Sequence, residues 1–209
     1  MADLANRFRP GSLLDVGGEG ILTLFMKRVE ITTANIKEAD ICYPGGKLPL
    51  EDESFDVVVS LDTIEHHPKD RRMAFLEDLY RVSRRGIIVC GPIGTPEHCV
   101  HEKEVFDSGV LSGVSRDYLG QHLEFGLPGS GEVSEMLRLL GGHVYYQGDF
   151  REIGASTEAS LLSYLSLSVQ TLKNISLDLL WDTAKHVSED CGPYTNRFYL
   201  VSEKDVNGI

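Results

Sequence analysis

One acidic residue and three closely spaced glycines follow a short apolar stretch near the N-terminus, in the run Ser12-Leu-Leu-Asp15-Val-Gly17-Gly18-Glu19-Gly20. Glycine has no side chain, so a backbone built from it can approach a bound ligand closely. The apolar residues predict a β-strand over 12–16, and the glycines predict a loop at its carboxyl end. Taken alone, this loop is compatible with any nucleotide-like ligand.

The position of Asp15 discriminates between two kinds of ligand. A dinucleotide pyrophosphate prefers a helix N-terminus that is free of negative charge, whereas a carboxylate suits the ammonium or sulfonium end of S-adenosylmethionine. The dinucleotide fingerprint G-x-G-x-x-G also fails, because Thr23 stands at its third glycine. Asp15 therefore favours S-adenosylmethionine, and an ordinary strand-to-helix turn is the alternative interpretation of the glycines.

Two further segments are expected to meet this loop, because ligands of a doubly wound sheet bind at the carboxyl ends of its strands. Asn35 ends the second expected strand, about 20 residues past the glycines, where a side chain commonly hydrogen-bonds ribose hydroxyls. A simple strand-end turn residue is the alternative for Asn35. The other segment is Ser60-Leu61-Asp62, which closes a nearly continuous apolar run.

The elements that must position these residues alternate along the first half of the chain. Strands are expected at 12–16, 29–34, 39–42, 55–61, 86–90, 143–150 and 197–202. Helices are expected at 20–27, 69–83, 102–114 and 132–140. This alternation predicts an α/β fold with a doubly wound parallel sheet. No linker composition divides the chain, so we expect one domain over 1–209, with an apolar helical insert at about 157–187.

The composition of the chain indicates which kinds of binding partner are expected. The formal net charge is −12, with 32 acidic against 20 basic residues, which disfavours binding to nucleic acid. No apolar run reaches the roughly 18–20 residues of a membrane span, and the N-terminus has no apolar signal region. The four cysteines share no metal-type spacing, as expected for reduced thiols. We therefore expect a cytoplasmic protein with a small-molecule substrate; the oligomeric state stays open.

The run from Leu48 to His66, Leu-Pro-Leu-Glu-Asp-Glu-Ser-Phe-Asp-Val-Val-Val-Ser-Leu-Asp-Thr-Ile-Glu-His, resembles the motif run of class I S-adenosylmethionine-dependent methyltransferases. The group called type 11 shows Leu-Pro-Phe, a short acidic loop, Ser-Phe-Asp, an apolar strand and then Leu-Glu-His. With the glycine loop and the segment 81–92, the resemblance covers about residues 12–92 in the right order. It implies a Rossmann-like, mostly parallel, seven-stranded sheet that ends in an antiparallel strand pair.

The resemblance also implies S-adenosyl-L-methionine as the cofactor and methyl transfer as the reaction. The residues implied to bind the cofactor are Asp15, Gly17, Gly18, Glu19, Gly20, Asn35, Ile36, Ser60, Leu61 and Asp62. The glycine loop would hold the methionine end, Asn35 and Ile36 would flank ribose and adenine, and 60–62 would close the site. The chain departs from the family pattern at Glu19, which replaces a glycine, at Asn35, which replaces a carboxylate, and at 42–46, which lack an acid.

His66 and His67 are the candidates for a catalytic base, because histidine titrates near neutral pH and both follow the strand that ends at the cofactor. The alternative is that His66 caps or packs under its loop. His98 and His101 match no strong ligand pattern, so no metal site is predicted. The expected acceptor is a small molecule, such as a sugar, a lipid-linked precursor or a secondary metabolite.

Two other functions are compatible with the same residues. The departures from the family pattern favour a non-catalytic cofactor-binding or scaffold protein. An NAD-dependent oxidoreductase on a similar sheet is the second alternative, which Asp15 and Thr23 disfavour. The first strand begins near residue 12, so we expect this chain to lack the N-terminal helices with which the family covers its substrate. We expect the 157–187 insert to take their place.

Overall fold

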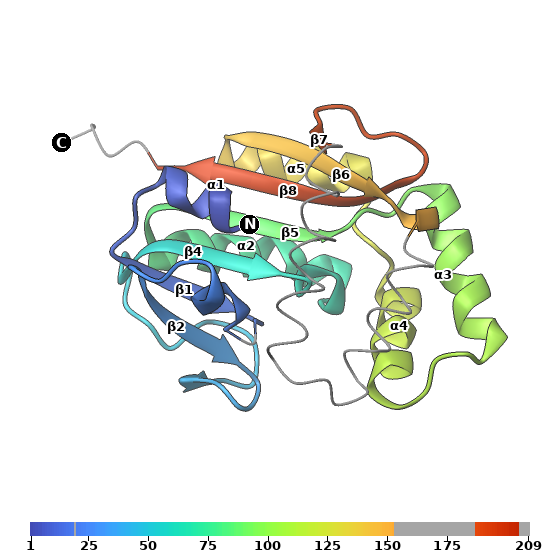
Figure 1. The fold of residues 1–209 in the computed structure, drawn as a ribbon, viewed down its shortest axis with the longest axis horizontal. Coiled ribbons are helices and arrows are strands. Elements are labelled where there is room, and N and C mark those ends of the chain that lie inside the picture. Colours follow the sequence, from blue (N-terminus) through green and yellow to red (C-terminus); the bar gives the residue numbers. More distant parts are fainter. Residues whose placement is uncertain (19, 153–186, 205–209) are drawn as a thin grey trace.

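The computed structural model describes residues 1–18, 20–152 and 187–204, and the strands of this part form one mixed sheet (Figure 1). The strand order is β3-β2-β1-β4-β5-β8-β6-β7. Neighbours from β3 to β5 run parallel, whereas β8 is antiparallel to β5 and β6, and β7 is antiparallel to β6. The expected α/β fold, mostly parallel with an antiparallel end, is confirmed.

The bounds of the elements follow the apolar segments of the sequence. The strands are β1 (Ser12–Val16), β2 (Glu30–Asn35), β3 (Ile41–Cys42), β4 (Phe55–Leu61), β5 (Ser83–Pro92), β6 (His143–Asp149), β7 (Val187–Ser188) and β8 (Thr195–Glu203). The helices are α1 (Ala2–Arg7), α2 (Arg72–Val82), α3 (Pro96–Ser108), α4 (Gly113–Phe125) and α5 (Ser130–Leu140). Short 3-10 turns lie at Ile21–Leu24, Ile64–His66, Lys69–Arg71 and Phe150–Glu152. Within the described part the sheet has eight strands, one more than expected, because the two-residue β7 pairs with β6.

Two expected helices differ from the structure. The one expected at 102–114 is two helices, since α3 ends at Ser108 and is followed by the C-cap Gly109, whose left-handed φ of 69° suits glycine. It also starts earlier, because the Thr95 hydroxyl caps it by accepting the N–H of His98. The helix expected at 20–27 is only a 3-10 turn over Ile21–Leu24; in this segment Leu22 and Met26 are buried, whereas Ile21 and Phe25 are exposed.

The central strands bury both of their faces, as parallel strands do. Alternate residues of a strand point to opposite sides, so Leu14 and Val58 pack toward α2 and α5, whereas Leu13 and Val57 pack with α1 and the turn at Ile21–Leu24. Figure 1 shows α2 and α5 on one side of the sheet and α1 on the other. It also places α3 and α4 beyond the carboxyl ends of β4 and β5, where they border the candidate site.

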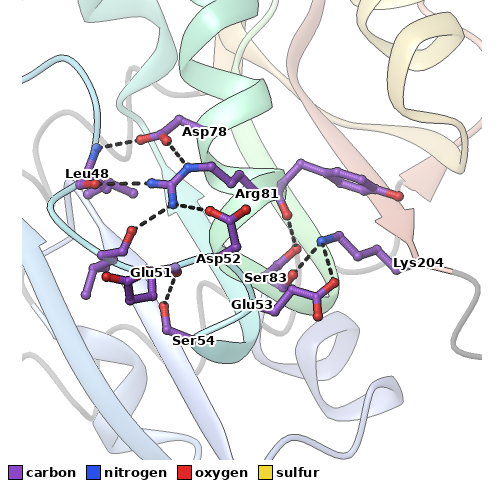
Figure 2. Close-up of polar contacts among 11 residues, drawn as sticks. Leu48, Glu51, Asp52, Glu53, Ser54, Asp78, Arg81, Ser83 and Lys204 are labelled. Atoms are coloured by element: carbon purple, nitrogen blue, oxygen red, sulfur yellow. Dashed lines mark hydrogen bonds and ion pairs between the residues drawn. The ribbon is translucent and has the colours of Figure 1, made fainter.

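Arg81 ties the segment that precedes β4 to helix α2 (Figure 2). Its guanidinium donates to the carbonyl oxygens of Leu48 (3.1 Å) and Leu50 (2.7 Å) and to the carboxylate of Asp52 (2.8 Å). It also pairs with Asp78 (2.8 Å), whose other oxygen accepts the N–H of Leu48 (2.6 Å). The Leu-Pro-Leu segment of the family resemblance therefore holds the entry to β4 in place.

The second half of the chain is described only in part. No helix of the described residues is both long and apolar enough to cross a membrane. The insert expected at 157–187 lies outside the described residues except for Val187, the first residue of β7. The single-domain organisation therefore stays a prediction.

Candidate functional site

The candidate site lies where the strand order reverses. The chain goes from β1 outward to β2 and β3 and then returns to β4 on the other side of β1. In register, Val16 of β1 lies between Ala34 of β2 and Ser60 of β4. The loops that follow these strands therefore meet at one edge of the sheet, which is the usual ligand site of such folds.

Two segments, the end of β2 and the loop after β4, hold the backbone of the glycine loop. The N–H of Gly17 donates to Ala34 O (2.8 Å), and the Asn35 amide donates to Gly17 O (3.0 Å). The Thr63 hydroxyl, from the loop after β4, donates to Val16 O (3.3 Å). Gly17 has a φ of +79°, and a Cβ there would lie 2.1 Å from the Thr63 hydroxyl oxygen. Only glycine fits this position, and Thr63 is a contact that the sequence did not reveal.

Asp15, which precedes the glycines, is buried, with 2% of its surface exposed. Its carboxylate lies against Gly18, since a Cβ on Gly18 would come within 2.2 Å of both carboxylate oxygens. Burial raises the pKa of Asp15 to about 6, and a hydrogen bond from the backbone of Gly20 opposes this shift. Because burial disfavours the charged form of this carboxylate, a cation bound beside it would stabilise that form. The predicted Glu19 lies outside the described residues.

The side chain of Asn35 forms hydrogen bonds with backbone atoms. Its oxygen accepts the N–H of Ile36 (2.8 Å), and its amide nitrogen donates to Gly17 (3.0 Å). These contacts fit the turn-residue interpretation, and a contact with ribose stays a prediction. Ile36 is 67% exposed, so an apolar surface lies beside the loop where adenine is expected.

The end of β4 carries Ser60, Leu61 and Asp62, as expected from the sequence. Ser60 is buried, and its hydroxyl has no hydrogen-bond partner within the described part of the chain. Asp62 has a φ of +50°, donates its N–H to Cys90 O (2.9 Å) and pairs with Arg197 of β8 (3.1 Å). The antiparallel end of the sheet thus reaches the site through Arg197, which no local sequence signal indicated.

The two candidate bases lie in different surroundings. His66 shares a hydrogen bond of 2.9 Å between its Nδ1 and Gln121 Oε1, and its ring centroid lies 4.9 Å from that of His122. Burial, followed by the charge of His122, lowers the pKa of His66 to about 4. His67 instead stacks on Phe75 at 4.3 Å, and its pKa is lowered by burial and then by the charge of Arg72. His66 is therefore neutral at pH 7 and lies among polar side chains, whereas His67 packs against α2.

The polar side chains beside His66 include residues to which the sequence analysis gave no role. Glu65 is 1% exposed, and burial, followed by the charge of Asp62, raises its pKa to about 8. His122 of α4 bonds through Nδ1 to Glu102 of α3 (2.9 Å). Burial opposes the charged form of His122, but Glu102 raises its pKa. Only the packing of α4 on the turn Ile64–His66, and of α3 on α4, brings these groups together.

Arg72 supports the same region and is buried, with 1% of its surface exposed. Its Nη1 lies 3.2 Å from each carboxylate oxygen of Glu132 in α5, and its Nε donates to His67 O (3.0 Å). Its Nη2 donates to the carbonyl oxygens of Phe125 and Gly126, at the end of α4. One buried side chain thus joins the histidine loop, α4 and α5.

Known proteins resemble this chain in part of its sequence and in its fold. Residues 19–90 match the family model described as a methyltransferase domain, and no curated protein matches the sequence. Phosphoethanolamine N-methyltransferase 2 of Haemonchus contortus, solved with S-adenosyl-L-methionine, is 17% identical with a TM-score of 0.50, over 97% of this chain and 51% of that one. A SAM-dependent methyltransferase from Archaeoglobus fulgidus is 15% identical with a TM-score of 0.51, over 98% of this chain and 95% of that one.

A third similar structure is the [4+2]-cyclase SpnF, at 15% identity and a TM-score of 0.54, over 99% of this chain and 80% of that one. At such identities the likenesses show the fold alone, and that fold is the class I methyltransferase fold. The chain spans about half the length of the Haemonchus protein, 51% of it.

Proposed function

We propose that this chain is an S-adenosylmethionine-dependent methyltransferase, which the match of residues 19–90 to a methyltransferase-domain model supports, and that it binds S-adenosylmethionine at the carboxyl ends of β1 and β4. We further propose that it transfers the methyl group to a small molecule. The observation that carries this proposal is the buried Asp15 carboxylate against Gly18. The cofactor brings an ammonium and a sulfonium, and either cation would stabilise the charged form of Asp15.

Each part of the site has a proposed role. Asp15, Gly17, Gly18 and Gly20 hold the methionine end, and Asn35 with Ile36 borders the ribose and adenine. Methyl transfer is an in-line displacement, for which the protein supplies proximity and alignment of the acceptor. The polar group around His66 is the proposed place where the acceptor loses its proton. The acceptor is proposed to be a sugar, a lipid-linked precursor or a secondary metabolite.

The rival functions give different results in one experiment. The likeness to a [4+2]-cyclase illustrates that one fold hosts several reactions, so binding and turnover are tested separately. Calorimetry with S-adenosylhomocysteine is expected to show binding, and calorimetry with NAD is expected to show none. Tight binding of NAD would instead indicate an oxidoreductase. Binding of S-adenosylhomocysteine without turnover on a broad acceptor panel would favour the scaffold.

Asp15→Asn is expected to weaken binding of S-adenosylhomocysteine at least tenfold, about 1.4 kcal/mol. The substitution keeps the size of the side chain and removes the charge that faces the cofactor's ammonium. Calorimetry at pH 7.5 measures the effect. Asp70→Asn is the matched control, because Asp70 is exposed in the turn Lys69–Arg71. Equal affinities of Asp15→Asn and the wild type would remove Asp15 from the site.

The same carboxylate makes binding depend on pH. The folded pKa of Asp15, about 6, lies above the ordinary value of about 3.9. Its contribution to the stability of the cofactor-free protein, about 3 kcal/mol, is therefore fully present below pH 4 and is lost as the pH rises through 6. The cofactor favours the charged form, so lowering the pH from 7.5 to 5 is expected to weaken binding about tenfold. Asp15→Asn is expected to abolish this dependence.

A further inference from the structure

Glu65, His66 and His122 form a compact cluster at the carboxyl end of β4. One ligand atom of each residue lies within 4.8 Å of the other two. Glu65 and His66 come from the turn Ile64–His66, and His122 comes from α4. The cluster has the composition of a metal site, two imidazoles and one carboxylate.

Two atoms of this cluster are buried without a partner. Glu65 is 1% exposed, and neither its Oε2 nor the Nε2 of His122 has a hydrogen-bond partner among the residues that the structure describes. Buried polar atoms are nearly always hydrogen-bonded, because an unpaired one costs free energy. Two such atoms in one cluster point to a ligand that binds between them.

Hydrogen bonds at Nδ1 orient the imidazole rings of both histidines. Nδ1 of His122 lies 2.9 Å from Glu102 Oε1, and Nδ1 of His66 lies 2.9 Å from Gln121 Oε1. Carboxylate and amide oxygens can only accept, so each Nδ1 carries the hydrogen and, in the neutral ring, each Nε2 keeps a free lone pair. Metal-bound histidines are oriented in this way by an acceptor at the other ring nitrogen.

We propose that Glu65, His66 and His122 bind one divalent transition-metal ion, with Glu102 and Gln121 as positioning residues. Two imidazoles and a carboxylate suit zinc or ferrous iron better than magnesium or calcium, which prefer oxygen ligands throughout. Ligand distances of roughly 2.0–2.2 Å require the three side chains to move slightly closer together. Three protein ligands leave a coordination position open, as in catalytic zinc sites.

The open position has a consequence that rests on the proposed function. The loop that carries Glu65 also carries Thr63, which contacts the glycine loop, so the ion and the cofactor are neighbours. An acceptor hydroxyl bound to the ion would release its proton to water. Its oxygen would then form the bond to the methyl carbon while the carbon–sulfur bond breaks toward sulfur. The ion therefore favours a hydroxyl-bearing acceptor.

Calorimetry with Zn²⁺ on the full chain, after chelator treatment and dialysis, tests the site. One ion per chain is expected, and Glu65→Gln and His122→Ala are each expected to weaken binding at least tenfold. Glu102→Gln is expected to weaken it about tenfold by releasing the His122 ring. His143→Ala is the matched control, because His143 is exposed on β6 and lies outside the cluster. The visible absorption of bound Co²⁺ gives a second readout, which is expected to be lost in Glu65→Gln.

Two results would overturn the proposal: no Zn²⁺ binding by the wild type, or unchanged binding in both Glu65→Gln and His122→Ala. Circular dichroism identifies a variant that fails to fold, and Glu65→Gln, which keeps the side-chain shape, then decides. Titration of S-adenosylhomocysteine into the same samples separates this proposal from the proposed function. Cofactor binding without Zn²⁺ binding would reject only the proposed metal site. Zn²⁺ binding without cofactor binding would reject only the proposed methyltransferase function.

Discussion

Replacing Arg72 with alanine is expected to lower the free energy of unfolding by about 3–5 kcal/mol, the range for breaking a buried ion pair. Arg72 is 1% exposed and pairs with Glu132. The substitution would leave the Glu132 carboxylate without its cation. It would also remove the donor to the carbonyl oxygens of His67, Phe125 and Gly126, whose burial without partners adds to the cost.

Urea denaturation measures this change, with Arg71→Ala as the matched control. Arg71 precedes Arg72 and is exposed, so its loss is expected to change the unfolding free energy by less than about 0.5 kcal/mol. Replacing the pair together, Arg72→Met with Glu132→Leu, is expected to be less damaging than Arg72→Ala, because no charge is left buried alone. A loss below about 1 kcal/mol in Arg72→Ala would show that the pair contributes little.

Gly18→Ala is expected to weaken binding of S-adenosylhomocysteine at least about a hundredfold, or about 2.7 kcal/mol. The new methyl group would lie 2.2 Å from both carboxylate oxygens of Asp15, closer than nonbonded atoms approach. Asp15 is buried, so its carboxylate has little room to move aside and would lose its alignment with the cofactor. The strain is also expected to lower the unfolding free energy by about 1–3 kcal/mol.

Calorimetry and urea denaturation on the same samples distinguish the two effects. Gly131→Ala is the matched control, because a Cβ there meets nothing within 4 Å; in helix α5 it is expected to stabilise by about 0.5–1 kcal/mol. Adding Asp15→Ala to Gly18→Ala removes the clash and is expected to restore stability without restoring binding. Wild-type affinity in Gly18→Ala would contradict the contact between this glycine and a functional Asp15.

The sequence predicted the elements whose apolar pattern is continuous. The bounds of β1 and β4 agree with the expectation, because both strands are buried on both faces and are followed by a glycine or a polar residue. β5 is longer than expected, Ser83–Pro92 rather than 86–90. Its end pairs with Phe198 and Arg197 of β8, a tertiary contact that local periodicity cannot reveal.

The candidate site was predictable only where it follows a strand. Asp15, Asn35 and Asp62 end parallel strands, and parallel strands bring their carboxyl ends to one edge. His122 and Glu102 lie on helices far along the chain: His122 reaches Glu65 only because α4 packs on the turn Ile64–His66, and Glu102 of α3 bonds to His122. No spacing along the sequence encodes that contact, so the sequence predicted no metal site.

The hydrogen bonds of Arg81 to Leu48, Leu50 and Asp52 (Figure 2) affect what a sequence resemblance to methyltransferases can indicate. Part of the run by which the sequence resembles the methyltransferases is a structural brace, which joins the segment before β4 to helix α2. A descendant that gave up its reaction would still need that brace to fold, and it would keep the same signature. The first part of the signature is thus a marker of architecture, and we expect Asp15 and Gly18 to distinguish an active enzyme from a chain that has lost the reaction.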